Sequence, residues 1–142
     1  MDVRLAVLAD YANMTLEGKL NIMGIFSEIN PPMLPFALPS MFLVVTYSAS
    51  IAEVGRQHKL EVELMDGEGL KILGIQSALT VPPGPRPGAP AAVSALLGLN
   101  GVRFEKADDY QFAILVGDQV KATVPLRVNE PKRRTDEPEG GK

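Results

Sequence analysis

Apolar side chains recur at every second position over much of the chain, which is the spacing of a β-strand with one buried face. The clearest case is 58–65, where the even positions are apolar apart from His58 and the odd positions before Met65 are Lys or Glu. Branched aliphatic residues are dense in such runs, which favours strand over helix. Strands are expected on this basis at 41–49, 58–65, 70–81, 92–105, 110–116 and 120–128.

The stretch 3–29 holds two apolar runs around a polar segment, and it predicts a long β-hairpin on which the rest of the chain packs. Alternate positions from Val3 to Tyr11 are all apolar, which predicts that this set forms one buried face. Gly18 can take the positive φ that a tight reversal needs. Two roles remain open for the polar residues here, namely turn formation or a contact patch for a partner. These residues are Asp10, Asn13, Lys19 and Asn21.

The two roles suit different members of this set. Asp10 and Asn13 have short side chains that can fold onto nearby backbone amides, which indicates turn formation. Lys19 has a long side chain that keeps its ammonium in water and is rarely needed to hold a turn, which indicates contact.

Two proline-rich segments interrupt the strands. Residues 30–40 contain four prolines and predict an ordered loop that caps one end of the core, or else an exposed apolar contact loop. The apolar residues of this loop are Met33, Leu34, Phe36 and Leu38. Residues 81–90 contain five prolines and predict a stiff surface connector, with recognition by an aromatic groove as the alternative.

Turn and corner signals refine the fold class. The sequence Asp-Gly-Glu-Gly at 66–69 predicts a hairpin turn, and Gly98 and Gly101 indicate a bulge within 92–105. Tyr110 follows an acidic pair at a strand start, as in the tyrosine corner of immunoglobulin-like domains. The chain is therefore expected to be an all-β, antiparallel β-sandwich of seven to nine strands, immunoglobulin-like or jelly-roll-like. One domain is expected over 1–128, followed by a disordered tail at 129–142, because that tail is almost wholly polar.

Several motifs resemble one family. The segments A-D-Y-A-N at 9–13 and G-K-L-N-I-x-G-I-F at 18–26 resemble the opening of a family of small bacterial proteins known as a domain of unknown function. Similar stretches follow at 56–69, at 109–118 and in P-L-R-V at 125–128. The resemblance covers about 1–128. It implies a fold and a bacterial origin, and it implies no activity.

The composition of the chain limits which kinds of site and partner are expected. The chain of 142 residues has no cysteine, so thiolate metal sites and thiol nucleophiles are excluded, and a cytoplasmic location is expected. A net charge of −3 argues against nucleic acid, since acidic residues also flank the basic run at 132–134. No apolar run approaches the length of a membrane span and no signal peptide is expected, so no membrane partner is predicted.

No motif predicts a catalytic or cofactor site. His58 is the single histidine, and its parity indicates a core or rim residue. The carboxylate pairs Glu61/Glu63 and Asp108/Asp109 lie on a solvated face and in a turn. No catalytic residue, cofactor or metal is expected.

The predicted function is a non-enzymatic protein-interaction or assembly module of a bacterial cytoplasm, whose partner is an unknown protein or a second copy. The alternative is a small-ligand or carbohydrate-binding sandwich that uses loops at one end, and a hydrolase is the third option.

Overall fold

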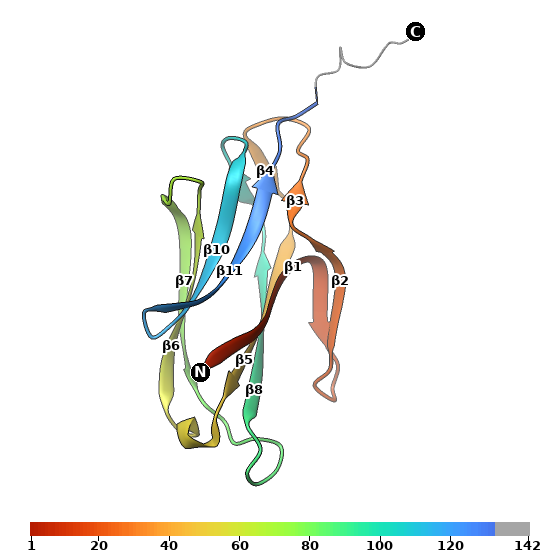
Figure 1. Ribbon diagram of the computed structural model, residues 1–142. Helices are drawn as coiled ribbons and strands as arrows, with labels where there is room; N and C mark the ends of the chain where they lie inside the picture. The colour runs from red at the N-terminus through yellow and green to blue at the C-terminus, as the bar shows by residue number, and fades with distance from the viewer. Residues whose placement is uncertain (133–142) are drawn as a thin grey trace.

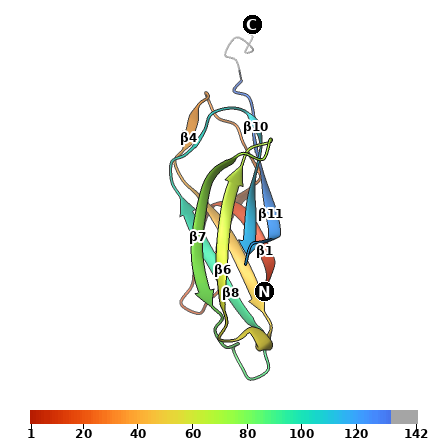
Figure 2. The same cartoon turned by 90° about the vertical axis from the view of Figure 1, so that its left-hand side faces the viewer.

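Two β-sheets pack face to face in the computed structural model, which describes residues 1–132 (Figures 1 and 2). Sheet A has the order β2-β1-β5-β8 and contains β1 (Asp2–Met14), β2 (Leu20–Phe26), β5 (Met41–Ala49) and β8 (Ala91–Leu99). Sheet B has the order β3-β11-β10-β6-β7 and contains β3 (Glu28–Ile29), β6 (Gln57–Met65), β7 (Lys71–Thr80), β10 (Asp108–Val116) and β11 (Gln119–Val128). A small sheet pairs β4 (Phe36–Leu38) with β9 (Val102–Phe104), and Ile51–Glu53 forms a short 3-10 helix, η1.

The predicted all-β, antiparallel sandwich is confirmed. Eight strands have seven residues or more, and the other three have two or three. The strand order distinguishes the two expected topologies, because β1, β5 and β8 lie side by side as the A, B and E strands of an immunoglobulin-like domain do. Strands β11, β10 and β6 likewise follow the order G, F, C. The sandwich is therefore immunoglobulin-like, with the β1–β2 hairpin added at one edge.

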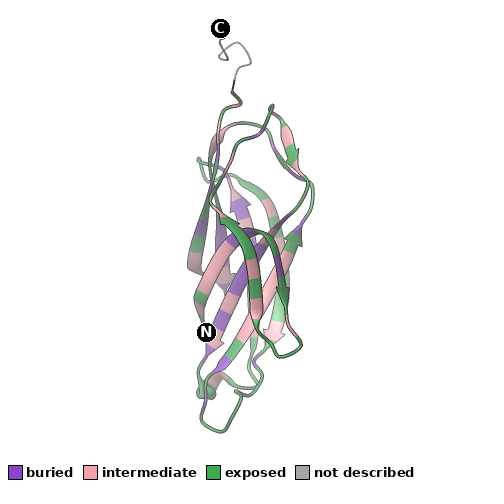
Figure 3. Ribbon diagram, turned by 90° about the vertical axis from the view of Figure 1, so that its right-hand side faces the viewer, coloured by how far each residue is buried: buried purple, intermediate pink, exposed green. Residues whose placement is uncertain are grey.

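The core lies between the two sheets and is built from alternate residues of both. Figure 3 shows buried positions alternating with exposed ones along the strands. Strands β6 and β10 follow the predicted strand parity, and their inward side chains form the centre of the core together with those of β5. Its largest fully buried side chains include Met41, Leu43, Leu64, Phe104, Phe112 and Leu126.

Two register shifts overturn predictions of which residues face inward. In β1 the pairing with β5 shifts between Val3 and Leu5, so that Ala6 and Leu8 pack on the core and Tyr11 points outward. The prediction of one buried face running from Val3 to Tyr11 is therefore wrong. A second shift in the β10–β11 pair leaves Val120 59% exposed, although alternation from the buried Leu126 and Val124 predicts an inward position for it.

Two segment predictions are also corrected. The single strand expected at 92–105 is two strands in different sheets, and Gly101, with φ of +71°, lies in the turn between them rather than in a bulge. The proline-rich segment 30–40 was expected to be a loop, and it contains the short strand β4. The three residues between Pro35 and Pro39 have backbone N–H groups, and these three residues pair with β9.

The end of β11 is held by residues far away in sequence. Strand β3 pairs in parallel with Arg127 and Val128. The Asn129 side chain then donates hydrogen bonds to Glu28 at 2.6 Å and to Asn30 at 2.9 Å. Asn129 therefore belongs to the folded domain, one residue beyond the predicted boundary. The remainder of the tail prediction falls largely on 133–142, outside the described residues, as does most of the basic run at 132–134.

Candidate interaction surface

The two outer faces of the sandwich differ in chemistry. On sheet B, alternate side chains of β6 and β7 form a charged and polar layer. Lys59 contacts Asp118 at 2.7 Å, and Glu61 accepts a hydrogen bond from Gln76 at 3.0 Å. Lys71 lies 3.4 Å from Glu63. This face meets the expectation for a sheet with one solvated side.

The outer face of sheet A carries no charged side chain from Leu5 onward across its four paired strands. Cross-strand register and strand alternation place the following residues on it: Leu5, Val7, Ala9, Tyr11 and Asn13 of β1, Asn21, Met23 and Ile25 of β2, Phe42, Val44 and Thr46 of β5, and Ser94, Leu96 and Gly98 of β8. We call this set the uncharged face. Its polar members are small hydroxyls and two amides, so nothing on it strongly resists loss of water.

Part of the uncharged face is already covered by its own side chains. Ala9 and Val44 point outward, yet both are fully buried by their neighbours. The rings of Tyr11 and Phe42 meet edge to face with centroids 5.3 Å apart. Around this covered centre, Tyr11 is 48% exposed, Met23 61% and Ile25 63%. The face is therefore a packed apolar layer with an exposed apolar margin, which is a feature of contact surfaces.

The exposed margin lies on a two-stranded arm. Pairing of β1 with β5 ends at Ala9 opposite Phe42, whereas β1 and β2 stay paired as far as Met14 opposite Leu20. Residues 10–25 thus form a hairpin arm beside the sandwich, visible at the right of Figure 1. Five of the eleven exposed large apolar residues of the described chain lie on this arm, namely Tyr11, Met14, Leu16, Met23 and Ile25.

The predicted polar patch is only partly assembled. Asn13 and Asn21 sit opposite each other, and the Asn21 amide donates to the Asn13 carbonyl oxygen at 2.9 Å. Asp10 projects from the other face of β1, against Gly24. Lys19 lies near the tip beside Glu17, at 3.4 Å, with both side chains largely exposed. The four residues therefore form no common patch, although Asn13 and Asn21 belong to the uncharged face.

The turn itself is closed without Asp10 or Asn13. The Thr15 backbone N–H donates to the Lys19 carbonyl at 2.8 Å, and the Lys19 N–H donates to the Thr15 hydroxyl at 3.0 Å. Gly18 has φ of +86°, as its predicted role requires. The prediction that Asp10 and Asn13 form the turn is therefore wrong, because strand pairing continues past both of them.

The predicted apolar loop is mainly a cap on the core. Leu34 and Leu38 pack against the central cluster, and Phe36 is half-buried opposite Phe104. Met33 alone of the four points outward, with 65% of its surface exposed. Three of the four residues thus have a structural role, and only Met33 is left for a contact.

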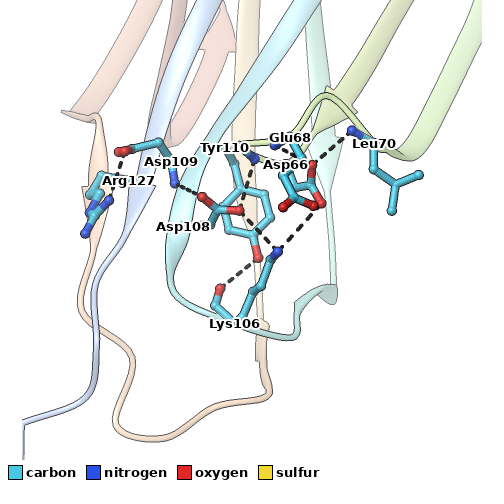
Figure 4. A network of polar contacts seen from close by, with 9 residues as sticks. Asp66, Glu68, Leu70, Lys106, Asp108, Asp109, Tyr110 and Arg127 are labelled. Carbon is cyan, nitrogen blue, oxygen red and sulfur yellow. Dashed lines mark hydrogen bonds and ion pairs between the residues drawn. The ribbon is translucent and has the colours of Figure 1, made fainter.

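A polar network closes the end of the sandwich where β6 and β7 turn (Figure 4). The Asp66 carboxylate accepts the N–H groups of Glu68 and Leu70, both at 2.9 Å, which fixes the predicted Asp-Gly turn. Asp108 accepts the Gly67 N–H at 3.0 Å, and this bond and the Asp109 N–H lower the pKa of Asp108. The network joins the β6–β7 turn to the start of β10. The carboxylates of Asp66 and Asp108 both have backbone N–H groups and the Lys106 ammonium as partners.

The tyrosine corner predicted for Tyr110 is confirmed. Its hydroxyl donates to the Lys106 carbonyl at 2.7 Å, and burial raises the pKa of this phenol (Figure 4). The bond ties β10 to the loop that precedes it.

The single histidine belongs to a small charged cluster that includes Glu53 and the Met1 ammonium. His58 lies at the rim, with its Nε2 atom 3.5 Å from a carboxylate oxygen of Glu53. Glu53 caps η1, and bonds from the Met1 ammonium and the Ser50 N–H lower its pKa to about 2. Within residues 1–132 no three His, Cys, Asp or Glu side chains gather to hold a metal ion. The same residues contain no helix that is long and apolar enough to cross a membrane.

One apolar cavity lies at the end of the sandwich opposite the polar network. It has a volume of about 400 Å³ and is lined by Ile51, Val54 and the loop at 83–89. Arg86 supplies its one charged or polar side chain. The cavity has the size of a ligand site but lacks the set of converging polar side chains that fixes a ligand.

Comparison with known proteins now identifies the family. The family model named DUF6941, a family of unknown function, matches residues 4–129. The chain belongs to this family. The DUF6941 match runs from β1 to Asn129 and so includes both sheets and the hairpin arm. A search of curated proteins found no match.

Membership in DUF6941 confirms the family resemblance seen in the sequence and assigns no activity. Sequence reasoning grouped Met23 with Ile25 on one face of their strand. It also grouped alternate residues of β1 up to Tyr11, but it assigned that set to the core and missed the members from β5 and β8. The parity of β5 and β8 offered a signal, because Val44 and Leu96 are apolar at positions that alternate with core residues. The register shift in β1 concealed their neighbours.

Proposed function

We propose that this protein is a non-enzymatic interaction module that binds a partner protein through the uncharged face and the hairpin arm. The observation that carries the proposal is the contrast between two sheets of one sandwich. Sheet B presents ion pairs to solvent, whereas sheet A presents Val7, Phe42 and Leu96 with no charge among them. Selection for solubility alone gives no reason for such a face.

The energetics of this face favour docking. Complete burial of a side chain such as Met23 or Ile25 contributes about 1.5–3 kcal/mol. No ion has to be stripped of water on this side, so the desolvation cost of a buried charge does not arise. The Asn13–Asn21 pair satisfies its own amide groups in part, so covering it leaves fewer unpaired polar atoms.

A bacterial cytoplasm is the setting we propose. The absence of cysteine is consistent with a reducing compartment, and the family resemblance implies a bacterial origin. Neither point bears on the identity of the partner.

The small-ligand alternative is supported by one feature, the cavity of about 400 Å³ beside η1. Its lining of proline, glycine and aliphatic side chains suits an apolar ligand rather than a sugar, since sugars require several hydrogen-bonding groups. We rank it second because the uncharged face draws its residues from four paired strands, whereas the cavity is lined mainly by one loop.

The test compares two matched exposed sites. Met23→Lys combined with Ile25→Lys places two charges on the hairpin arm, and Val120→Lys places one on an exposed apolar position of sheet B. We expect affinity capture from a bacterial lysate to lose its partners with the arm variant and to keep them with Val120→Lys. Melting curves should stay close to that of the native protein in both cases, because exposed substitutions change stability by about 0.5 kcal/mol. Unchanged capture by a folded arm variant would refute the proposal.

A further inference from the structure

The two sheets have four free edges, and three of them carry features that discourage pairing with another strand. Strand β7 begins with the charged Lys71, and β11 contains Pro125 and is covered at one end by β3. Strand β2 contains Gly24 with φ of +73°, which distorts its edge. Charges, prolines and local distortions are the means by which natural sheets block unwanted pairing.

Strand β8 has none of these features. Its nine residues, Ala91–Leu99, include no charge, no proline and no residue with positive φ. It pairs with β5 without a register shift from Ala49 opposite Ala91 to Met41 opposite Leu99. Among the described residues, no backbone hydrogen bond reaches the side of β8 that faces away from β5. A long, regular and uncharged edge of this kind is a template for strand addition.

The core is also incomplete beside this edge. Ala95 and Leu97 of β8 are only half-buried although they point inward. Together with Leu60 and Ile75 they line a small apolar recess of about 40 Å³ between β8 and β7. A strand added to β8 would bring inward-pointing side chains to this open side.

We propose that β8 pairs antiparallel with β8 of a second copy about a two-fold axis at Ala95. This register overlaps all nine residues and matches the pleat, because residues opposite each other then share a face. On the inner face Ala91 lies opposite Leu99 and Val93 opposite Leu97, whereas on the outer face Ala92 lies opposite Gly98 and Ser94 opposite Leu96. Every opposing pair is small or apolar.

A second copy fits this edge for reasons that the strand itself supplies. A two-fold axis at Ala95 places this residue against its own copy, so a charged side chain there would meet a like charge, and position 95 carries alanine. The small Ala95 at the centre lets the two backbones approach. The pairing would join two four-stranded sheets into one of eight strands and would double the uncharged face.

This inference rests on the proposed assembly function, and it uses a different edge of sheet A from the hairpin arm. The two can therefore fail separately. The dimer edge is probed at Ala95, and the partner-binding face is probed at Met23 and Ile25.

The experiment uses single cysteines, which report on one position because the chain has none of its own. In the full-length protein, Ala95→Cys places the thiols of the two copies directly opposite each other, with Cβ atoms about 4.5–5.5 Å apart. Ala92→Cys is the matched control on the same strand. Its thiols lie six residue steps apart, about 20 Å, because each faces position 98 of the other copy.

We expect light scattering of the native protein to give twice the mass of one chain. A short thiol cross-linker should give covalent dimer with Ala95→Cys and at least tenfold less with Ala92→Cys. Ala95→Lys should be monomeric, because its ammonium can reach water through the open side of one copy and would be trapped between two. The comparison of Ala95→Cys with Ala92→Cys tests the β8 pairing even if Ala95→Lys does not fold.

Three results would overturn the dimer. These are a native protein that is monomeric at about 100 μM, equal cross-linking at positions 92 and 95, and open-ended assemblies larger than a dimer. The arm variant at Met23 and Ile25 should keep the dimer mass. A dimer that persists while partner capture proves insensitive to the arm would refute the proposed binding face and leave the β8 pairing intact.

Discussion

Single polar groups in this domain are placed where two chain segments must be joined. Tyr110 donates to the Lys106 carbonyl, Asp66 closes the β6–β7 turn, and Glu53 caps η1. Each group receives or donates bonds that the local backbone cannot supply alone. The sequence motif around Tyr110 and the Asp-Gly turn were both sufficient to predict these roles, because each depends on residues close together in the chain.

Replacing Tyr110 with Phe should lower the free energy of unfolding by about 0.5–1.5 kcal/mol, because the hydrogen bond from the buried tyrosine to the Lys106 carbonyl is lost. Tyr11→Phe is the control, since that ring is exposed and its packing on Phe42 survives the loss of the hydroxyl. Denaturant unfolding of both variants would measure the difference. Equal effects would mean that the corner bond adds no stability.

The lowered pKa of Glu53 predicts a pH dependence of stability. Its folded-state pKa of about 2 lies below the ordinary value of 4.5, so the charged form is stabilised by folding. This contribution is complete above about pH 4.5 and is lost as the pH falls toward 2. Glu53→Gln should therefore unfold at lower denaturant than the native protein at pH 7, and the gap should close by about pH 2. Glu17→Gln, at the exposed hairpin tip, should show little difference at any pH.

The inward face of a strand could be predicted from sequence where apolar and polar residues alternate without a break. It could not be predicted where one extra residue shifts the register. The bounds of β5 and the inward faces of β6 and β10 follow directly from alternation. In β1 the register shift after Val3 reverses which alternate residues face the core, and no residue type near Arg4 indicates such a shift. The division of β8 from β9 was missed because Gly98 and Gly101 suit a bulge as well as a turn.

The hairpin arm offers a test at the level of one element. Gly24 has φ of +73°, and a Cβ atom there would overlap the Asp10 carboxylate, whereas Gly18, with φ of +86°, has open space around it. Gly18→Ala should cost about 1–2 kcal/mol from the backbone conformation alone. Gly24→Ala should cost more, and adding Asp10→Ala should recover the excess.

Melting curves of these three variants would measure the two contributions separately. If Gly24→Ala and Gly18→Ala lose equal stability, the Asp10 side chain moves aside without cost. Asp10 would then have no part in shaping the arm.

At the scale of the molecule, the arrangement of strands into sheets was beyond the reach of local pattern. The antiparallel sandwich follows from many short alternating runs, but the pairing of β1 with β5 and of β3 with β11 joins distant segments. The candidate site depends on this arrangement, since residues of four strands form the uncharged face. Sequence could therefore indicate individual members such as Met23, and it could not show that they share one face with Phe42 and Leu96.

The absence of charge along β8 predicts how its dimer should respond to salt. Ion pairs between exposed groups weaken as ionic strength rises, because the screening length falls from about 10 Å at 0.1 M to 3 Å at 1 M. The dissociation constant of the β8 dimer should change less than about tenfold over this range, since no charge lies on the strand. Sedimentation at 0.1 M and 1 M NaCl would measure it. A dimer that falls apart in high salt must be held by another surface.

The pairing of β3 with the end of β11 also affects how the protein folds during its synthesis on the ribosome. Asn30 bonds Asn129, which is translated 99 residues later, and sheet B lacks two of its long strands until β10 and β11 are made. Contacts of such long range form late and slowly. The growing chain must therefore carry the apolar β2 segment for most of its synthesis, and the β8 segment from Leu99 onward, without a completed sandwich. These two segments are where we expect a chaperone that recognises apolar stretches to bind the nascent chain.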